Sequence, residues 1–287
     1  MNRRDFIKMG VGAGLGGLAL TSVRAGAGHE TRRPNILWIT MDDARADTLG
    51  CYGRPWVRTP HMDAVAARGV RFETAIVQNP VCVPSRHSMK SGHYAHVFGT
   101  TAMGKPAAVM PEFMTRVREV PNLLNAWKNI GMSPVNIGKT HAYQHDWRHQ
   151  KDIPEDFDVF GRPRNEKLKA RLEEAGCRYP TVVTRTHAWA IGGIVPLEPR
   201  ETNTWRIGDL AVEKLTELAG RDEPFFLRVS FHAPHVPCRV PQSYFIDPSR
   251  IDLPVPSEDE LASKPRFEQE QLRIYSGGLD LTREQIG

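Results

Sequence analysis

A cysteine begins the segment of this chain that could do the most chemistry. Cys82 is followed at fixed spacing by Pro84, Ser85, Arg86 and Gly92, in the pattern C-x-P-S-R-x5-G. The arginine offers charge-assisted hydrogen bonds to an anion, and its charge does not depend on pH near neutrality. A lone cysteine is most often a small buried apolar residue, so the surrounding sequence must decide between the two interpretations.

Three further polar groups each follow a short apolar run. The pair Asp42 and Asp43 offers hard oxygen ligands, which suit a divalent cation such as calcium. Lys139 can bind an anion, and His141 and His235 can transfer protons near neutral pH. An acidic pair can also form a solvated turn, and an isolated lysine or histidine is commonly a surface residue. Their shared position after apolar runs therefore favours a common site.

The elements that would position these residues alternate between strands and helices. The apolar runs predict strands over 35–40, 135–138 and 225–231, and apolar spacing predicts helices over 60–69, 121–130 and 204–218. Residues 70–77 are expected to be extended, and the proline-rich and charged segment 239–270 is expected at the surface. This alternation predicts an α/β sheet with helices on both faces, in which ligands bind beyond the carboxyl ends of the strands.

These segments resemble the sulfatase family. The resemblance is carried by the motif from Cys82 to Gly92 and by blocks at residues 34–43, 59–72, 138–141 and 233–237. It implies an alkaline-phosphatase-like fold with a mixed, mostly parallel central sheet. It also implies that this chain, over residues 28–287, is the N-terminal portion of a sulfatase catalytic domain whose C-terminal subdomain is missing.

The resemblance also assigns roles to the candidate residues. Cys82 would be oxidised by formylglycine-generating machinery to formylglycine, whose hydrate would attack the sulfur of a sulfate monoester. Arg86, Lys139, His141 and His235 would then be catalytic residues that contact the sulfate or the aldehyde. Asp42, Asp43 and the converted Cys82 would bind Ca²⁺, with Mg²⁺ as the other possible ion.

The resemblance leaves part of that metal site unfilled. In the family, an aspartate followed by asparagine or histidine completes the metal site after the histidine block at 233–237. This sequence contains no Asp-Asn or Asp-His pair. The sequence therefore predicts a fragment with the sulfatase motif whose own turnover has to be established by assay.

The N-terminal segment is typical of an export signal. Arg3 and Arg4 precede a short apolar run, and Ala25-Gly26-Ala27 fits a cleavage site. Residues 1–27 are therefore expected to engage the Tat (twin-arginine) translocase and to send the protein to the periplasm or outside the cell, without a stable membrane anchor. Much of the formal charge of +5 lies here, so the charge gives no reason to expect a nucleic-acid partner.

Other interpretations remain open at this point. A phosphonate or phosphodiester hydrolase could share the same motif, and a secreted remnant could bind anions without catalysis. His141, His145 and His149 recur every four residues, which could indicate zinc, although no carboxylate completes a familiar zinc motif. The substrate is expected to be a small-molecule or carbohydrate sulfate ester.

The cysteine count limits disulfide formation. The chain has four cysteines, Cys51, Cys82, Cys177 and Cys238. If Cys82 is converted, three remain and at most one pair can form, and the sequence does not determine which pair.

Overall fold

A parallel β-sheet organises the part of the chain that carries the candidate residues. The structure, a computed structural model, describes residues 33–45, 47–98, 120–141, 149–151, 166–175, 192–236, 238–251 and 257–275. Among these, four strands form one sheet in the order β1 (Ile36–Thr40), β5 (Phe225–Ser230), β2 (Ser133–Gly138) and β3 (His149–Lys151). All three pairings are parallel, so the carboxyl ends of β1, β5 and β2 lie at one edge.

Strand β5 is buried along its whole length because helices cover both of its faces. On one face lies α7 (Asn203–Ala219), whose first turn is capped by the Thr202 hydroxyl, which accepts from the Trp205 N–H. Buried side chains of α7, β5 and β2 form the main apolar cluster between them: Val135, Ile137, Ile207, Leu218, Phe225, Leu227 and Val229.

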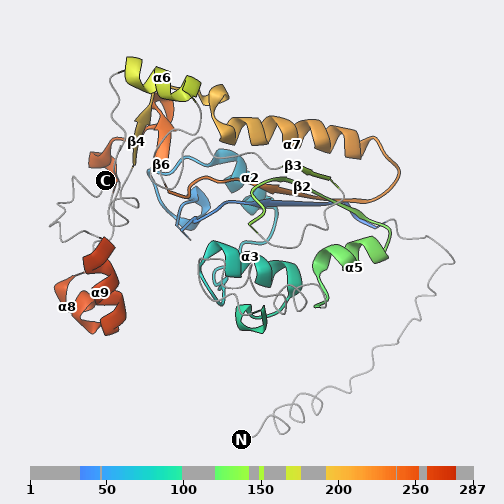
Figure 1. Cartoon of the computed structure of the whole chain (residues 1–287), viewed down its shortest axis with the longest axis horizontal. Helices are drawn as coiled ribbons and strands as arrows, with labels where there is room; N and C mark the ends of the chain where they lie inside the picture. The colour runs from blue at the N-terminus through green and yellow to red at the C-terminus, as the bar shows by residue number, and fades with distance from the viewer. Residues whose placement is uncertain are drawn as a thin grey trace, which may run out of the picture. The chain divides into compact units, whose positions relative to one another are not determined.

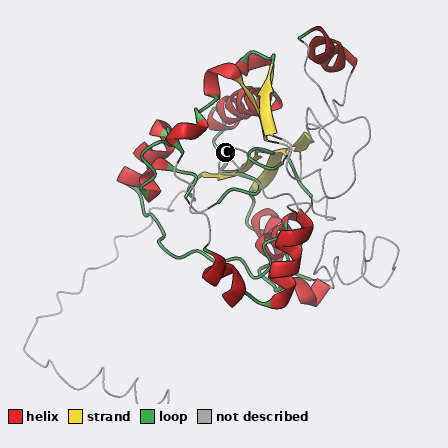
Figure 2. Cartoon of the chain, turned by 90° about the vertical axis from the view of Figure 1, so that its left-hand side faces the viewer, coloured by secondary structure: helices red, strands yellow, loops and turns green. Residues whose placement is uncertain are grey.

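The opposite face of the sheet is covered by α5 (Leu123–Asn129) and α3 (Cys82–Ser91). Phe226 of β5 stacks on Trp127 with ring centres 5.5 Å apart and meets Trp38 of β1 edge-on at 6.0 Å. Figure 1 shows α7 on one side of the strands and α3 and α5 on the other, and Figure 2 shows the strands between helices from a second direction. The predicted α/β sheet with helices on both faces is therefore confirmed.

Helix α3 contains the cysteine motif from end to end. It begins at Cys82, and Gly92 follows its last residue in the left-handed conformation, at φ +70°, donating its N–H to Ser88 O at 2.8 Å. The glycine of the motif therefore ends the helix, because this conformation is unfavourable for residues with a Cβ. Pro84 is the third helical residue, where its missing N–H breaks no helical hydrogen bond.

The other predicted segments are mostly confirmed. Helix α2 (Pro60–Arg68) starts at a proline and stops before Gly69, as its spacing predicts. Residues 70–77 form neither a helix nor a strand, so the extended segment expected there is not a β-strand. No helix in the described part of the chain combines the length and the apolar character needed to cross a bilayer.

A smaller sheet pairs one strand that precedes α7 in the chain with one that follows it. Strands β4 (Gly192–Val195) and β6 (Cys238–Pro241) pair in parallel, and α6 (Glu166–Glu174) contributes Leu168 and Leu172 to an apolar cluster with Val195. The remaining described elements are short: η1 (Gly50–Tyr52), η2 (Ala95–Phe98), η4 (Pro199–Glu201), η5 (Gln242–Tyr244), η6 (Pro248–Arg250), α8 (Glu258–Ser263) and α9 (Arg266–Tyr275).

Candidate active site

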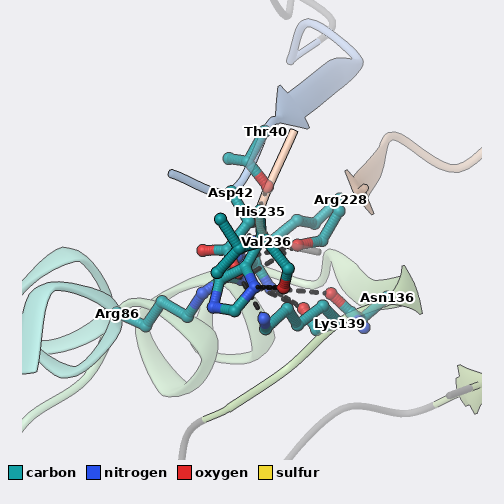
Figure 3. A network of polar contacts seen from close by, with 9 residues as sticks. Thr40, Asp42, Arg86, Asn136, Lys139, Arg228, His235 and Val236 are labelled. Atoms are coloured by element: carbon teal, nitrogen blue, oxygen red, sulfur yellow. Dashed lines mark hydrogen bonds and ion pairs between the residues drawn. The ribbon is translucent and has the colours of Figure 1, made fainter. Parts of the chain in front are cut away.

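Asp42 lies at the centre of a buried polar network at the carboxyl edge of the sheet (Figure 3). One carboxylate oxygen accepts from Arg86 Nη2 at 3.2 Å, and the other forms an ion pair with Lys139 Nζ. The Asp42 N–H donates to Ala233 O at 3.2 Å, which ties the end of β1 to the loop after β5. The structure thus brings together residues that are 44 positions apart or more in the sequence.

The charge state of Asp42 follows from these contacts. Burial by itself would raise the pKa of this carboxyl, but the positive charges and hydrogen bonds of Lys139 and Arg86 outweigh burial and lower the pKa below its ordinary value. Asp42 is therefore a carboxylate at neutral pH, held between two cations.

Arg86 joins α3 to two strands of the sheet. Its Nη1 donates to Lys139 O at 3.1 Å and to Ser230 Oγ at 2.9 Å. The backbone is close here as well, since Lys139 N–H donates to Ser230 O at 2.9 Å. Gly138 permits this approach: a Cβ at that position would lie 2.1 Å from Ser230 O, and its φ is +83°.

Cys82 lies half-buried at the first position of α3, within the field of the same charges. Burial raises the pKa of its thiol, the negative charge of Asp42 raises it further, and Lys139 and Arg86 act in the opposite direction with a smaller effect. The net rise keeps the thiol protonated at neutral pH. The unmodified side chain is therefore a poor nucleophile, because a cysteine attacks as its thiolate.

The loop after β5 places two histidines beside a cavity. His235 Nδ1 donates to Val236 O at 2.5 Å, which leaves Nε2 as the acceptor of the neutral ring. His232 and His235 line a cavity of about 570 Å³. Most of the other lining side chains are apolar or aromatic, including Leu197, Trp205, Val212, Phe231 and Tyr244.

Two of the predicted site residues are exposed at the surface. Asp43 is exposed with φ +60°, and its charge contributes to raising the pKa of the Cys238 thiol, although burial is the larger cause. His141 is exposed with φ +40°. His145 lies outside the described residues, and His149 belongs to β3, so the helix expected to carry the zinc histidines is not present at His149.

The acids do not form a divalent-cation site by themselves. Both oxygens of Asp42 contact cationic side chains, and Asp43 is exposed beside it. No group of three or more histidine, cysteine, aspartate or glutamate side chains in the described residues could hold a metal ion. The described residues by themselves therefore do not supply the six to eight oxygen ligands that a bound calcium ion takes.

The structure adds residues that sequence reasoning did not select. Arg228 of β5 is buried, and Lys139 O, Asn136 and Ser230 accept hydrogen bonds from it. The signal in the sequence was a single charged residue inside the apolar strand 225–231. An arginine in the middle of a buried strand requires polar partners, so this position could have been included among the candidates.

Comparisons with known proteins agree with the resemblance in the sequence. The uncharacterized sulfatase YidJ of Escherichia coli is 29% identical over 249 residues, covering 82% of this chain and 45% of the relative. Human iduronate 2-sulfatase is 27% identical over 235 residues, covering 79% of this chain and 41% of the relative. The chain thus spans less than half the length of these two relatives.

A solved structure supports the fold. A phosphonate monoester hydrolase from Silicibacter pomeroyi superposes with a TM-score of 0.63 at 19% identity, covering 88% of this chain and 54% of that one. This likeness concerns the fold alone. The family model described as Sulfatase matches residues 34–272, which include the network around Asp42, the cysteine helix and the histidine loop. The chain therefore belongs to the sulfatase family.

Proposed function

We propose that this chain carries the sulfate-binding half of a sulfuric ester hydrolase active site. The observation that carries the proposal is the convergence of Cys82, Arg86 and Lys139 around Asp42 in a member of the sulfatase family. A sulfate ester is a compact anion with oxygens on all sides. Two buried cations suit such a group. They lie beside the first turn of α3, where the backbone N–H groups have no partner within the helix.

The chemistry of each side chain in the network suits it to a different step: anion binding, positioning or proton transfer. Arg86 and Lys139 would bind sulfate oxygens with donors that keep their charge throughout the reaction. Asp42 would hold both cations in place. His235, with its Nε2 available, would exchange a proton with the alcohol or with the nucleophile. His141 stays a second candidate for a proton donor because it lies two residues after Lys139.

The nucleophile is proposed to be formylglycine made from Cys82. The raised pKa of the thiol argues against attack by sulfur itself. When present, the aldehyde hydrate would supply one hydroxyl for attack on sulfur and a second through which sulfate is later expelled. A serine at this position has no second hydroxyl on the same carbon, so a sulfated serine could release sulfate only through a separate hydrolysis step.

A divalent cation at this site would need ligands beyond the two adjacent aspartates. Asp42 and Asp43 would contribute hard oxygens to such an ion, commonly calcium in the resemblance, only together with further ligands. Ca²⁺ titration of the purified protein by calorimetry, repeated with Asp43→Asn, tests this point directly. No binding to either protein would remove calcium from the proposal.

The substrate proposal rests on the cavity beside His235. Its aromatic and aliphatic lining suits the ring of an ester's alcohol part, whereas the charged network suits the sulfate. One relative is named for iduronate, a sugar acid, which supports a carbohydrate sulfate. We expect Trp205→Ala to raise KM for such an ester several-fold while it leaves the binding of inorganic sulfate unchanged.

The decisive experiment combines mass spectrometry with an assay. The protein, co-expressed with a formylglycine-generating enzyme, is digested, and the peptide containing Cys82 is examined for an aldehyde in place of the thiol. Turnover of an aryl sulfate is then compared with turnover of a phenyl phosphonate, with Cys82→Ala as the control. Sulfate turnover abolished in the control supports the proposal. Faster phosphonate turnover would favour the phosphonate hydrolase, and intact thiol with no turnover would favour a non-catalytic anion-binding remnant.

The N-terminal segment is proposed to direct export. Residues 1–27 would engage the Tat translocase through Arg3 and Arg4, placing the folded protein in the periplasm or outside the cell. Replacing both arginines by lysine should retain the protein in the cytoplasm, which cell fractionation would detect. Unchanged distribution of the variant would contradict this proposal.

A further inference from the structure

Arg228 lies in the middle of the central strand and is 3% exposed. Its neighbours in the sheet register are Trp38 of β1 and Asn136 of β2. The guanidinium lies 5.4 Å from the centre of the Trp38 ring, and Nη1 donates to Asn136 Oδ1 at 2.9 Å. These contacts fix the direction of the side chain along the sheet, toward the carboxyl edge.

The same guanidinium reaches the two atoms that hold Arg86. Arg228 donates to Lys139 O at 3.2 Å and to Ser230 Oγ at 3.2 Å, and both atoms also accept from Arg86. A weaker contact, at 3.5 Å, joins Arg228 to Thr40 Oγ1. Arg228 therefore sets the positions of the backbone at Lys139 and of the hydroxyl that orients Arg86 (Figure 3).

This arrangement concentrates positive charge. Arg86, Lys139 and Arg228 are all buried, and among the described residues Asp42 is the acid paired within this group. Arg228 forms no ion pair in the described part of the chain, and its Nε has no hydrogen-bond partner there. Burial, and then repulsion from Arg86, lower the pKa of Arg228 to about 9, so the side chain still carries its charge at pH 7.

Buried charge without a counterion is unfavourable unless something compensates it. The charge of Arg228, which has no ion-pair partner among the described residues, lies next to the groups that would contact sulfate. A compensating anion bound at Arg86 and Lys139 would relieve the repulsion among the three cations, and a doubly charged anion would relieve it most. The structure therefore supplies a reason for the chain to keep an arginine in an otherwise apolar strand.

We propose that Arg228 is a positioning residue of the anion site, whose buried charge, acting through Lys139 and Arg86, favours a tetrahedral dianion. This inference rests on the proposed function, since it assumes that the anion binds at Arg86 and Lys139. Inorganic sulfate is the probe, because it carries two charges and binds without turnover. Perchlorate, a tetrahedral anion with one charge, is its matched comparison.

The test measures sulfate and perchlorate affinity at pH 7 by calorimetry for the wild type, Arg228→Gln and Arg228→Lys. The glutamine variant should bind sulfate about tenfold more weakly, and the lysine variant, which keeps the charge but loses the fork of donors, should fall between the glutamine variant and the wild type. Arg221→Met is the control, because it removes an exposed positive charge whose partner is Glu217. It should leave sulfate affinity unchanged.

Two results would overturn the inference. One is equal sulfate affinity in Arg228→Gln and wild type; the other is a wild type that binds perchlorate as tightly as sulfate, a measurement that needs no variant to fold. These outcomes differ from failure of the proposed function. Sulfate binding that depends on Arg228 without ester turnover would contradict the hydrolase alone, whereas turnover that is indifferent to Arg228 would contradict this inference alone.

Discussion

At the scale of single residues, the buried ion pair between Asp42 and Lys139 is expected to make a large contribution to stability. Lys139→Gln would leave a buried carboxylate with Arg86 as its remaining cation, which should lower the free energy of unfolding by roughly 3 kcal/mol. The double variant Asp42→Asn with Lys139→Gln should recover part of this loss, because neither side chain is then charged. Urea unfolding of the three proteins measures both effects.

His87 is expected to make the free energy of unfolding depend on pH. It is buried in α3, and desolvation, followed by the charge of Lys90, lowers its pKa from 6.5 to about 4. Between these two values the unfolded chain binds a proton that the folded chain does not. Stability from this group is therefore complete above pH 6.5 and is lost progressively as the pH falls toward 4, by roughly 3 kcal/mol.

Comparing His87→Gln with the wild type isolates this contribution. The variant should lose less stability between pH 7 and pH 4.5 than the wild type, as measured by urea unfolding at several pH values. Carboxyl groups titrate in both proteins and cancel in the comparison. Parallel stability curves for the two proteins would show that His87 is not buried as described.

At the scale of elements, the contact between β2 and β5 makes a sharp prediction at Gly138. An alanine there would place its Cβ 2.1 Å from Ser230 O and would also occupy φ +83°. Gly131 is the matched control, since it has φ +81° with no atom within 4 Å of an added Cβ. Gly131→Ala should cost about 1 kcal/mol from backbone strain, and Gly138→Ala about 1–3 kcal/mol more because the strands must separate.

Thermal unfolding and sulfate affinity are measured for both variants, Gly138→Ala and Gly131→Ala. Gly138→Ala should also weaken sulfate binding, because Lys139 follows directly and its N–H bonds to Ser230 O. Equal losses of stability in the two variants would mean that β2 and β5 lie further apart than described here.

The elements that could be predicted from the sequence are those with a local pattern. The runs ending before Asp42, Lys139 and His232 are mostly apolar, and this correctly placed three polar groups at the ends of strands. Strands β4 and β6 are short, and each needs the other to form a sheet, so no local periodicity marks them. Arg228 was not selected from the sequence for a related reason. Its hydrogen-bond partners lie on or directly after three strands that become adjacent only after folding.

At the scale of the whole molecule, apolar side chains remain on the surface. On strand β1, at the edge of the described sheet, Leu37 and Ile39 are exposed. Between residues 62 and 77, six large apolar side chains are exposed: Met62, Val65, Val70, Phe72, Ile76 and Val77. Exposed apolar area of this kind favours association, and β1, an edge strand among the described residues, adds to it.

We therefore expect these 287 residues, expressed alone, to self-associate with rising concentration. The triple variant Val70→Ser, Phe72→Ser and Ile76→Ser should shift the association to higher concentration, whereas Val212→Ser, which changes an exposed valine on α7, should have little effect. Sedimentation velocity over a range of concentrations measures this. A monomer at every concentration would contradict the expectation.

The position of β5 between β1 and β2 has a consequence for the order of events during synthesis. Ser230, which holds Arg86, is made 144 residues after it, so the ribosome must complete β5 before the two neighbouring strands can be joined. Until then, Cys82 belongs to a nascent chain without its buried surroundings. An enzyme that modifies Cys82 therefore has the most access to this residue before β5 is inserted into the sheet.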